Sequence, residues 1–419
     1  MASKPRISRL IGAINVGSFR ISAMVAGVGE SGELTVLGSS HRAAQGIKRG
    51  YVADMAAATY AIRDAVEKAE KLAGATVSGL WLSCSGAGLA SRIASVEIEM
   101  GGRRVEEEDL ESLLVAGRDA LDPDGRMVLH AQPAFYTLDG MHGVANPVGL
   151  HADRLGVDIH VVMADGAPVR NLKEAVQNAH FEVEGIVASP LAAGYACLAE
   201  EERELGVAMI EMGAEVTQVA VYAAGMMVGL ETIQRGGADI TDAIASAFGI
   251  RRFQAERIKC FSGSAIASPQ DNRETVPVDG PEVERGSERT ISRADLVSVI
   301  TGQLDLLFSD IGKSLDRLGF ASHRDRQVVV TGGASQLAGI ADYAQAALGR
   351  PVRAGKPAML PGLPEAHSVA GFSTLAGLVL YAVEDPVDVR SVGPATQVTS
   401  RFGPGELAVR LFRALRDNF

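Results

Sequence analysis

The chain has 419 residues, which is enough for about three domains of ordinary size. Hydrophobic residues make up 47% of it and charged residues 22%, and this balance excludes wholesale disorder. The net charge is −11, with 40 Lys and Arg against 51 Asp and Glu, so we expect no nucleic acid partner. Three widely separated cysteines predict neither a disulfide framework nor a zinc site, and they favour a reducing cytosol.

No segment predicts passage through a membrane. The N-terminus is basic, but Asn15 interrupts the following apolar stretch too early for a signal peptide. The most apolar window, 369–383, is shorter than the roughly 20 residues that a spanning helix needs. We therefore expect this window to be a buried core helix.

The first half of the chain begins with a predicted β-meander and a helix. Apolar residues alternate about a glycine turn over 10–26, and a third strand follows at 34–37. Helical spacing of apolar residues predicts a helix over 54–73, ended by Gly74. The elements expected next are a strand at 81–85, an acidic helix at 106–120, strands at 128–138 and 157–163, a helix at 170–179 and a strand at 185–188.

The second half repeats the opening pattern about 195 residues later. A strand over 206–213 runs into a turn of small residues, and strands at 217–223 and 226–232 follow. This repetition predicts an internal duplication in which each half supplies one turn to a shared cleft. The remaining expectations are a loop or hairpin at 262–292, a long helix at 292–318, a buried strand at 327–331 and a helix at 337–348.

Three turns have the composition of phosphate-binding loops. They are Asn15–Arg20, Glu211–Gln218 and Thr331–Gln336, and each follows a predicted strand. Small residues there let backbone N–H groups approach an anion. Any one turn is weak support, but two of them stand at matching places in the duplicated halves.

Other motifs lack the context that they need. Gly27–Gly32 spells GxGxxG but lies between two strands, so it predicts a hairpin turn. Gly312–Ser314 resembles the end of a Walker A motif but falls inside a predicted helix. No histidine spacing is typical of a metal site, and we predict no resident metal ligand cluster; the histidines in question are His130, His142, His151 and His160.

With these turns in place, the whole chain resembles the superfamily of actin and the sugar kinases, and within it the FtsA family of bacterial cell division proteins. The resemblance rests on the three turns and on further stretches: Gly46–Gly50, Gly143–Gly149, Ser189–Gly194, Ala255–Lys259 and Val330–Ile340. It places a connecting helix at 190–199 and a second connection at Gly236–Ile240. It implies an α/β, actin-like fold: a duplicated ribonuclease-H-like fold with two lobes around a nucleotide cleft.

The resemblance also implies subdomains. Their expected ranges are 1–84 and 166–204 for subdomain 1A, 85–165 for the family's extra subdomain 1C, 205–241 and 306–384 for subdomain 2A, 242–305 for subdomain 2B, 385–403 for a flexible linker and 404–419 for a terminal helix.

By the same resemblance the cleft holds ATP and Mg²⁺. The implied contacts are Asn15, Gly17, Ser18, Arg20, Glu211, Gly213, Ala214, Thr217, Gly236, Gly237, Glu256, Lys259, Gly332, Gly333 and Gln336. Asn15 and Gln218 replace carboxylates that Mg²⁺ would favour, and Glu215 adds negative charge where phosphates belong. We therefore expect weak nucleotide binding with slow or absent hydrolysis, and we identify no catalytic base.

The last 16 residues predict an amphipathic helix that lies on a membrane surface. Its apolar positions share one face and its arginines lie outside that stripe: Leu407, Leu411, Phe412, Leu415 and Phe419 against Arg410, Arg413 and Arg416. Such a helix binds anionic lipids through its basic residues. Docking on the protein's own body is the alternative, although the preceding linker disfavours it.

The resemblance implies partners as well: the C-terminal peptide of FtsZ bound by subdomain 2B, further copies of this chain in filaments, and later division proteins. Arg251, Arg252, Arg285, Arg289 and Arg293 could pair with an acidic peptide, the last three being our chosen contacts. The expected function is to polymerise on the cytoplasmic face of the membrane at the septum and tether FtsZ there, as a peripheral protein. The alternatives are a pilus-assembly relative of the PilM type and a superfamily kinase, and the terminal helix discriminates among the three.

Overall fold

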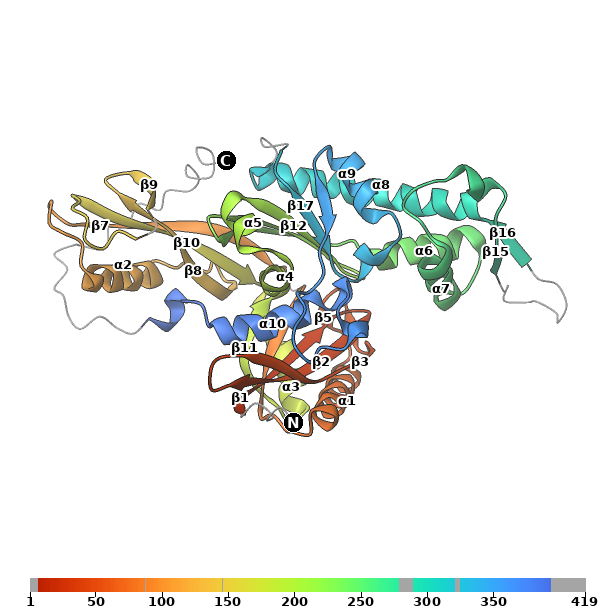
Figure 1. Ribbon diagram of the computed structural model, residues 1–419, viewed down its shortest axis with the longest axis horizontal. Helices are drawn as coiled ribbons and strands as arrows, with labels where there is room; N and C mark the ends of the chain where they lie inside the picture. The colour runs from red at the N-terminus through yellow and green to blue at the C-terminus, as the bar shows by residue number, and fades with distance from the viewer. Residues whose placement is uncertain (1–6, 87, 145, 279–288, 321–324, 393–419) are drawn as a thin grey trace.

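Two five-stranded sheets with matching strand order form the centre of the protein (Figure 1). The computed structural model describes residues 7–86, 88–144, 146–278, 289–320 and 325–392. The first sheet has the order β11-β6-β1-β2-β3, with β1 (Ile7–Val16), β2 (Arg20–Gly29), β3 (Leu34–Ala43), β6 (Gly79–Cys84) and β11 (Glu182–Ala188). The second has the order β14-β13-β12-β17-β18, with β12 (Val207–Met212), β13 (Thr217–Ala223), β14 (Met226–Ile233), β17 (Val328–Thr331) and β18 (Val352–Ala354).

The backbone register confirms the predicted duplication. Asn15 pairs with Ser22 across the first hairpin, and Glu211 pairs with Gln218 at the same place in the second. In each sheet the first strand of the hairpin also pairs in parallel with a later strand, β6 in one case and β17 in the other. The chain is therefore α/β with two lobes of equal topology, as an actin-like fold requires.

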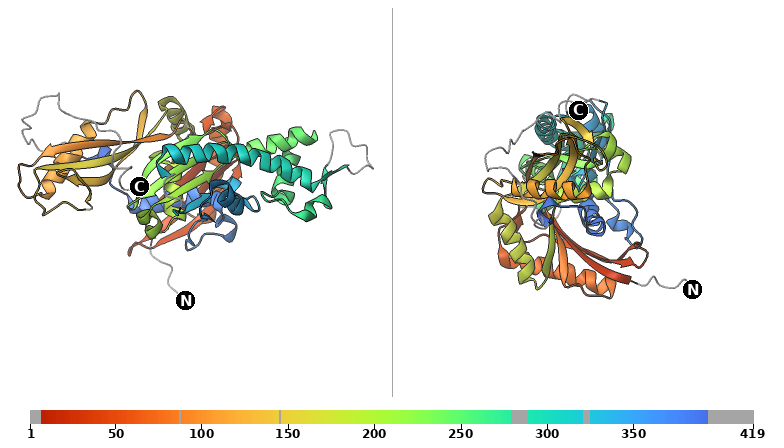
Figure 2. Two further views of the ribbon diagram at one scale, coloured as in Figure 1. Left: turned by 90° about the horizontal axis from the view of Figure 1, so that it is seen from above. Right: turned by 90° about the vertical axis from the view of Figure 1, so that its left-hand side faces the viewer.

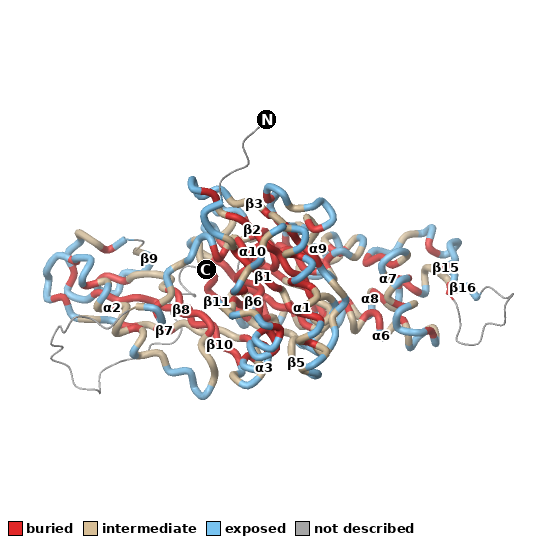
Figure 3. Tube along the Cα trace, turned by 90° about the horizontal axis from the view of Figure 1, so that it is seen from below, coloured by how far each residue is buried: buried red, intermediate tan, exposed pale blue. Residues whose placement is uncertain are grey.

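Helices cover both lobes and cross between them. In the first lobe α1 (Met55–Ala73) packs on β2 and β3, and α3 (Gly166–Asn178) packs beside it. Two apolar helices, α4 (Ser189–Cys197) and α10 (Ser373–Glu384), pack against each other at the centre, where the buried residues concentrate (Figure 3). The second lobe carries α8 (Arg293–Arg317) and α9 (Ile340–Leu348), and the short α5 (Glu200–Leu205) joins the lobes.

One connection lies elsewhere than the resemblance implied. Residues 236–240 do not connect the lobes, because they begin α6 (Gly237–Phe248) within the second lobe. The helix that returns to the first lobe is α10, which contacts β1, β2 and β6 as well as α4. The apolar window at 369–383 is thus a core helix, as its composition predicted.

An extension projects from each end of this centre (Figures 1 and 2). At one end the sheet β7-β10-β8-β9 carries α2; its elements are β7 (Ala90–Glu99), α2 (Glu107–Asp119), β8 (Met127–Leu138), β9 (Met141–Val144) and β10 (Arg154–Ala164). At the other end α6, α7 (Arg252–Ser262) and a hairpin of β15 (Thr275–Val278) and β16 (Arg289–Ser292) surround the start of α8. A small hairpin, β4 (Ile47–Lys48) and β5 (Tyr51–Val52), follows β3.

The segment after α10 packs on the first extension. Val389 is fully buried in its core, and Asp388 accepts a hydrogen bond from the backbone N–H of Ala131 at 3.3 Å. Arg390 donates to the carbonyl oxygen of Val128 at 2.9 Å. Residues 385–392, which we expected to begin the linker, are therefore part of the folded body.

The rest of the expected linker and the terminal helix at 404–419 lie outside the described residues. No helix in the described ranges is long and apolar enough to cross a bilayer.

Candidate functional site: the cleft between the lobes

The first phosphate-like turn joins β1 to β2 and is closed by its own backbone. The N–H of Gly17 donates to the carbonyl oxygen of Arg20 at 3.1 Å, and a Cβ on Gly17 would lie 2.9 Å from that oxygen. Asn15 precedes the turn, and its Oδ1 accepts a hydrogen bond from the Ser83 hydroxyl at 2.7 Å. The Asn15 oxygen therefore holds strand β6 in place.

The second turn repeats this geometry in the other lobe. The N–H of Gly213 donates to the carbonyl oxygen of Val216 at 2.9 Å, and a Cβ on Gly213 would lie 2.6 Å from it. Glycine is required at both positions because any side chain would collide with the turn's own carbonyl. The two turns thus have the same backbone geometry and differ in the side chains around them.

A buried carboxyl group lies behind the second turn. Glu211 accepts hydrogen bonds from the hydroxyls of Ser189, at 2.8 Å, and Thr374. Burial raises the pKa of Glu211 above its ordinary value, while these two hydrogen bonds act in the opposite direction. Residues from β12, α4 and α10 meet here, so the carboxyl group joins the lobes at their central helices.

Gln218 completes this cluster from the neighbouring strand. Its side-chain amide lies 2.5 Å from the Ser189 hydroxyl through Oε1, while its buried Nε2 has no partner among the described residues. Ser189 has only one proton and is also bonded to Glu211. Exchanging the amide oxygen and nitrogen gives both contacts of Ser189 a donor, with Gln218 donating to Ser189 and Ser189 donating to Glu211.

Glu215, at the tip of the second turn, reaches across to the first lobe. Its Oε2 accepts a hydrogen bond of 2.5 Å from the backbone N–H of Arg49, in the hairpin of β4 and β5. The adjacent N–H, that of Gly50, donates to the hydroxyl of Ser18 in the first turn at 3.1 Å. The hairpin tip is therefore bonded to both phosphate-like turns.

The guanidinium of Arg20 is hydrogen-bonded to the backbone of the loop before α10. It donates to the carbonyl oxygen of Gly371 at 2.6 Å, and its guanidinium lies 3.9 Å above the centre of the Phe372 ring. Burial lowers its pKa. This loop also approaches the third turn, because a Cβ on Gly371 would lie 3.0 Å from Nε2 of Gln336 and 3.6 Å from Cα of Gly333.

Three further residues of the expected site stabilise the turns themselves: Thr217, Gly236 and Gly332. The Thr217 hydroxyl donates to the carbonyl oxygen of Arg235 at 2.8 Å. A Cβ on Gly236 would lie 2.6 Å from the carbonyl oxygen of Gly213, and Gly332 has a φ of +90° where only glycine is unstrained. The N–H groups of Gly237 and Ala238 donate to the carbonyls of Gly213 and Ala214, at 3.0 and 2.6 Å, which holds α6 against the second turn.

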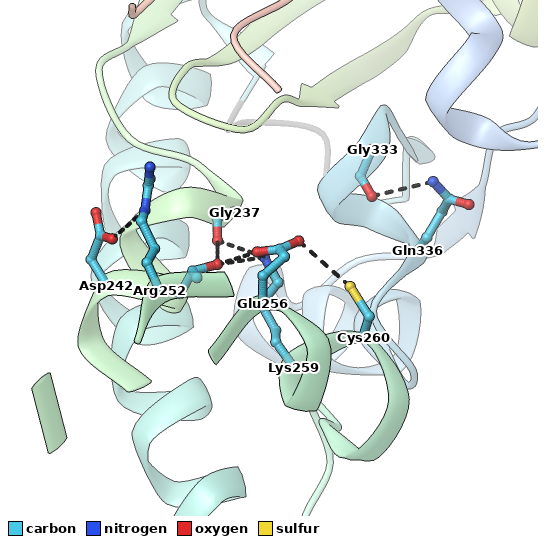
Figure 4. Close-up of polar contacts among 9 residues, drawn as sticks. Gly237, Asp242, Arg252, Glu256, Lys259, Cys260, Gly333 and Gln336 are labelled. Carbon is cyan, nitrogen blue, oxygen red and sulfur yellow. Dashed lines mark hydrogen bonds and ion pairs between the residues drawn. The ribbon is translucent and has the colours of Figure 1, made fainter. Parts of the chain in front are cut away.

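The pair expected near ribose or adenine is satisfied within the protein (Figure 4). The ammonium of Lys259 donates to Glu256 at 2.7 Å, to the Thr241 hydroxyl at 2.8 Å and to the carbonyl oxygen of Gly237 at 2.9 Å. Glu256 also accepts a hydrogen bond from the Thr241 hydroxyl. Burial alone would raise the pKa of Glu256, but the hydrogen bonds from Lys259 and Thr241 have the larger effect, so the pKa is lowered. Gln336 is the more open of the third-turn residues, with a 3.4 Å contact from its Nε2 to the carbonyl of Gly333.

The described arrangement does not fit a magnesium–triphosphate group. Mg²⁺ needs several hard oxygen ligands, but the oxygens of Asn15 and Glu211 are engaged with Ser83, Ser189 and Thr374. Within the described ranges, no cluster of three or more His, Cys, Asp or Glu side chains could hold a metal ion. Glu215 brings a negative charge to the second turn, and Arg20 is bonded elsewhere.

The arginines expected to bind a partner peptide differ in their surroundings. Arg293 pairs with the buried Asp271 and with Glu274, the latter at 3.2 Å, and also donates to the carbonyl of Ser262 at 3.1 Å. Arg289 is exposed on β16 and makes a hydrogen bond of 2.8 Å to the carbonyl oxygen of Phe248. Arg285 and the eight membrane-facing positions of 404–419 lie outside the described residues.

Two features of the cleft were not identified from the sequence. Thr374 had no distinguishing pattern, because its partner Glu211 is 163 residues away in the chain. The hairpin of 47–52 was noted only for its likeness to the family, although the Arg-Gly pair at its tip is a turn signal. Its contact with Glu215 joins positions 166 residues apart, which no local pattern predicts.

Comparison with family models gives two matches. Residues 208–377 match the model described as cell division protein FtsA, and residues 86–163 match the SHS2 domain inserted in FtsA. The second range coincides with the extension formed by β7, β8, β9, β10 and α2.

Curated relatives match along almost the whole chain. Cell division protein FtsA of Agrobacterium fabrum is 33% identical over 98% of this chain and 95% of its own length. The proteins of the same name from Rhizobium meliloti and Escherichia coli are 33% and 29% identical, covering 98% and 90% of this chain and 95% and 91% of their own lengths.

Solved structures with this fold include a PilM–PilN type IV pilus biogenesis complex, with a TM-score of 0.63 and 17% identity, over 91% of this chain and 100% of the other. An MreB protein of Spiroplasma citri bound to AMPPNP has a TM-score of 0.56 and 14% identity, over 90% of this chain and 96% of the other. At these identities the likeness establishes the actin-like fold alone.

Proposed function

This chain belongs to the FtsA family of cell division proteins, and from that premise we propose that it is a structural actin-like protein of the division site. It polymerises on the cytoplasmic face of the cell membrane, tethers FtsZ filaments there and recruits later division proteins. The observation that carries the proposal is the match to curated FtsA proteins over nearly the full length of both chains. Its attachment to the membrane is peripheral and is made by residues 404–419.

The periodicity of the terminal segment supports this attachment. Sixteen residues form a helix of about 24 Å that lies in the interface, with its arginines towards anionic head groups. A single helix of this kind binds reversibly, whereas many helices on one filament bind with avidity raised by about 10²–10⁴. Filament assembly and membrane attachment therefore reinforce each other.

The surface around α7 supports binding of an FtsZ peptide by subdomain 2B. Phe253 and Phe261 are 65% and 84% exposed on this helix, which also carries the exposed Arg257 and is preceded by the exposed Arg251. Arg289 is exposed on the neighbouring hairpin. An acidic peptide with apolar side chains would find both kinds of contact here. Arg293 serves this surface by holding Asp271, which fixes the base of the hairpin.

The proposed function does not depend on hydrolysis of a nucleotide. ATP and Mg²⁺ bind weakly, if the second turn opens, and hydrolysis is slow or absent. The side chains of the cleft support this, because the carboxyl group of Glu211 is held by two hydroxyls and is not free to activate water. For the same reason a superfamily kinase is the poorer alternative.

A pilus-assembly relative of the PilM type is the other alternative. The structural likeness to the PilM–PilN complex has 17% identity and gives the fold only. The FtsA relatives share about a third of their residues with this chain, and the inserted SHS2 domain also matches. These matches favour the division protein.

The test is reconstitution on lipid. We expect the full chain to bind anionic vesicles, to form filaments on lipid monolayers seen by electron microscopy with or without ATP, and to bring purified FtsZ to the vesicles. The matched protein lacking 404–419 should do none of these on the membrane. Equal vesicle binding by both proteins, or failure of the full chain to recruit FtsZ, would refute the proposal.

A further inference from the structure

The contact between Glu215 and Arg49 crosses the cleft where a nucleotide's phosphates would be expected from the fold. Glu215 belongs to the turn of the second lobe, and Arg49 belongs to a hairpin of the first. The donor is a backbone N–H and the acceptor is a carboxylate, 2.5 Å apart. Among the described residues no cation forms an ion pair with Glu215, and its carboxylate is bonded to the Arg49 N–H.

The hairpin tip is built to present N–H groups. Arg49 and Gly50 have φ values of +50° and +77°, which is the backbone of a two-residue turn with both central residues left-handed. The tip packs closely against the backbone of Gly86, because a Cβ on Gly50 would lie 2.6 Å from Cα of Gly86. Its two adjacent N–H groups therefore point at the phosphate-like turns, one towards Glu215 and one towards Ser18.

Adjacent backbone N–H groups of this kind favour an anion, and phosphate and carboxylate oxygens are interchangeable acceptors for them. With a small residue at position 215 the Arg49 N–H would lack its acceptor from the second lobe. We propose that Glu215 is a built-in substitute for a terminal phosphate, which closes the two lobes on each other without nucleotide. This inference rests on the proposed function only in taking the cleft to be the place where lobe closure is controlled.

The proposal has a direct consequence for nucleotide binding. A bound phosphate would compete with Glu215 for the Arg49 N–H and would be repelled by its charge. Removing the carboxylate should therefore loosen the empty protein and improve nucleotide binding at the same time. A residue that merely stabilised its own turn would not have these opposite effects.

The experiment compares the full chain with Glu215→Gln and Glu215→Gly, and with Glu201→Gln as a control that removes one exposed carboxylate from α5. Hydrogen exchange of the peptide containing Arg49 and Gly50 is measured without nucleotide. Affinity for a fluorescent ATP analogue is measured with Mg²⁺. We expect at least tenfold faster exchange in Glu215→Gly, which leaves the Arg49 N–H without its acceptor. We expect at least tenfold tighter nucleotide binding in both Glu215 variants, because both remove the charge, and no change in the control.

Unchanged exchange in both Glu215 variants would overturn the proposal, and so would faster exchange without any gain in affinity. Glu215→Gln is nearly isosteric, so it keeps the test open if Glu215→Gly fails to fold. Vesicle binding and FtsZ recruitment by the same preparations report on the proposed function separately. Their retention alongside unchanged exchange would reject the Glu215 contact alone.

Discussion

Substitution of Gly377 by alanine tests whether close contact between α4 and α10 holds the centre of the protein together. Gly377 lies on the buried face of α10, and its Cα faces the backbone of Ala192 on α4. A Cβ built there would lie far inside 3.0 Å of the Ala192 carbonyl oxygen, a distance that real Cβ atoms essentially never show. The obstacle is backbone, so no side-chain rotation relieves it.

The cost follows from this geometry. The two helices would have to separate by roughly 1–2 Å, which opens gaps around side chains in the close-packed core. Alanine gains about 1 kcal/mol over glycine in a helix interior, while overpacking costs about 1–3 kcal/mol and more when backbone must move. Because the backbone must move here, we expect a net loss of about 2 kcal/mol or more in the free energy of unfolding of Gly377→Ala.

The matched control is Gly302→Ala on α8. Position 302 is exposed and helical, and a Cβ there would meet nothing within 4 Å. This variant should gain about 0.5–1 kcal/mol from helix propensity alone. Urea titrations followed by circular dichroism measure both variants. If Gly377→Ala unfolds at the same urea concentration as Gly302→Ala, the tight helix contact is not what holds the lobes together.

Three other predictions follow from particular groups. Deletion of 404–419 should leave the urea midpoint unchanged while vesicle co-sedimentation falls to background, and retained binding would locate the anchor elsewhere. Arg293→Ala should lower the free energy of unfolding by about 3 kcal/mol, because it leaves the 2%-exposed Asp271 without its cation. Arg289→Ala should leave the free energy of unfolding unchanged and weaken binding of the FtsZ peptide, measured by titration calorimetry. Burial lowers the pKa of His160 from 6.5 to about 3 in the folded protein, so the unfolded chain binds a proton at this histidine at a higher pH than the folded protein does. The free energy of unfolding therefore falls by about 1.36 kcal/mol per pH unit as the pH drops from 6.5 towards 3. His160→Gln should remove its own contribution to this slope from acid titrations of unfolding, while that of His130, whose pKa burial also lowers to about 3, remains.

The duplicated meander could be predicted because its signal is local. Strands β1 and β12 each end in small residues, and the alternation around them is visible within about ten residues. The helices α1 and α8 were predicted within one residue at each end, since their apolar spacing is regular. Strand β7 was missed although Ser95–Met100 alternates polar and apolar residues, a pattern typical of a strand.

The segment after α10 shows where local reasoning fails. Its prolines and lack of periodicity predicted a linker from residue 385, yet Val389 is buried in a core formed about 230–300 residues earlier in the chain. Burial of one valine and the hydrogen bonds of Asp388 and Arg390 fix the segment without any regular element longer than one turn. A single buried residue gives no periodic signal in the sequence.

The sequence predicted the two turns of the candidate site but not the partners of their side chains. Residue types identified the two turns, because glycine at 17 and 213 is demanded by the turn backbone. The sequence also predicts that Glu215 and Gln218 weaken the binding of phosphate and Mg²⁺. What it could not show is how these side chains are satisfied, since Arg49 and Ser189 come from distant segments.

The matched positions of the two turns explain why the cleft acts as a joint. Asn15 and Ser22 in the first lobe correspond in register to Glu211 and Gln218 in the second, so the same backbone carries a neutral pair on one side and a carboxyl–amide pair on the other. The second pair bonds to Ser189 of α4, and α4 and α10 cross between the lobes. Because these polar groups are buried and bonded to one another, opening the cleft exposes all of them at once. Stability of the closed form therefore depends on the same side chains that, in the proposed function, weaken the binding of Mg²⁺.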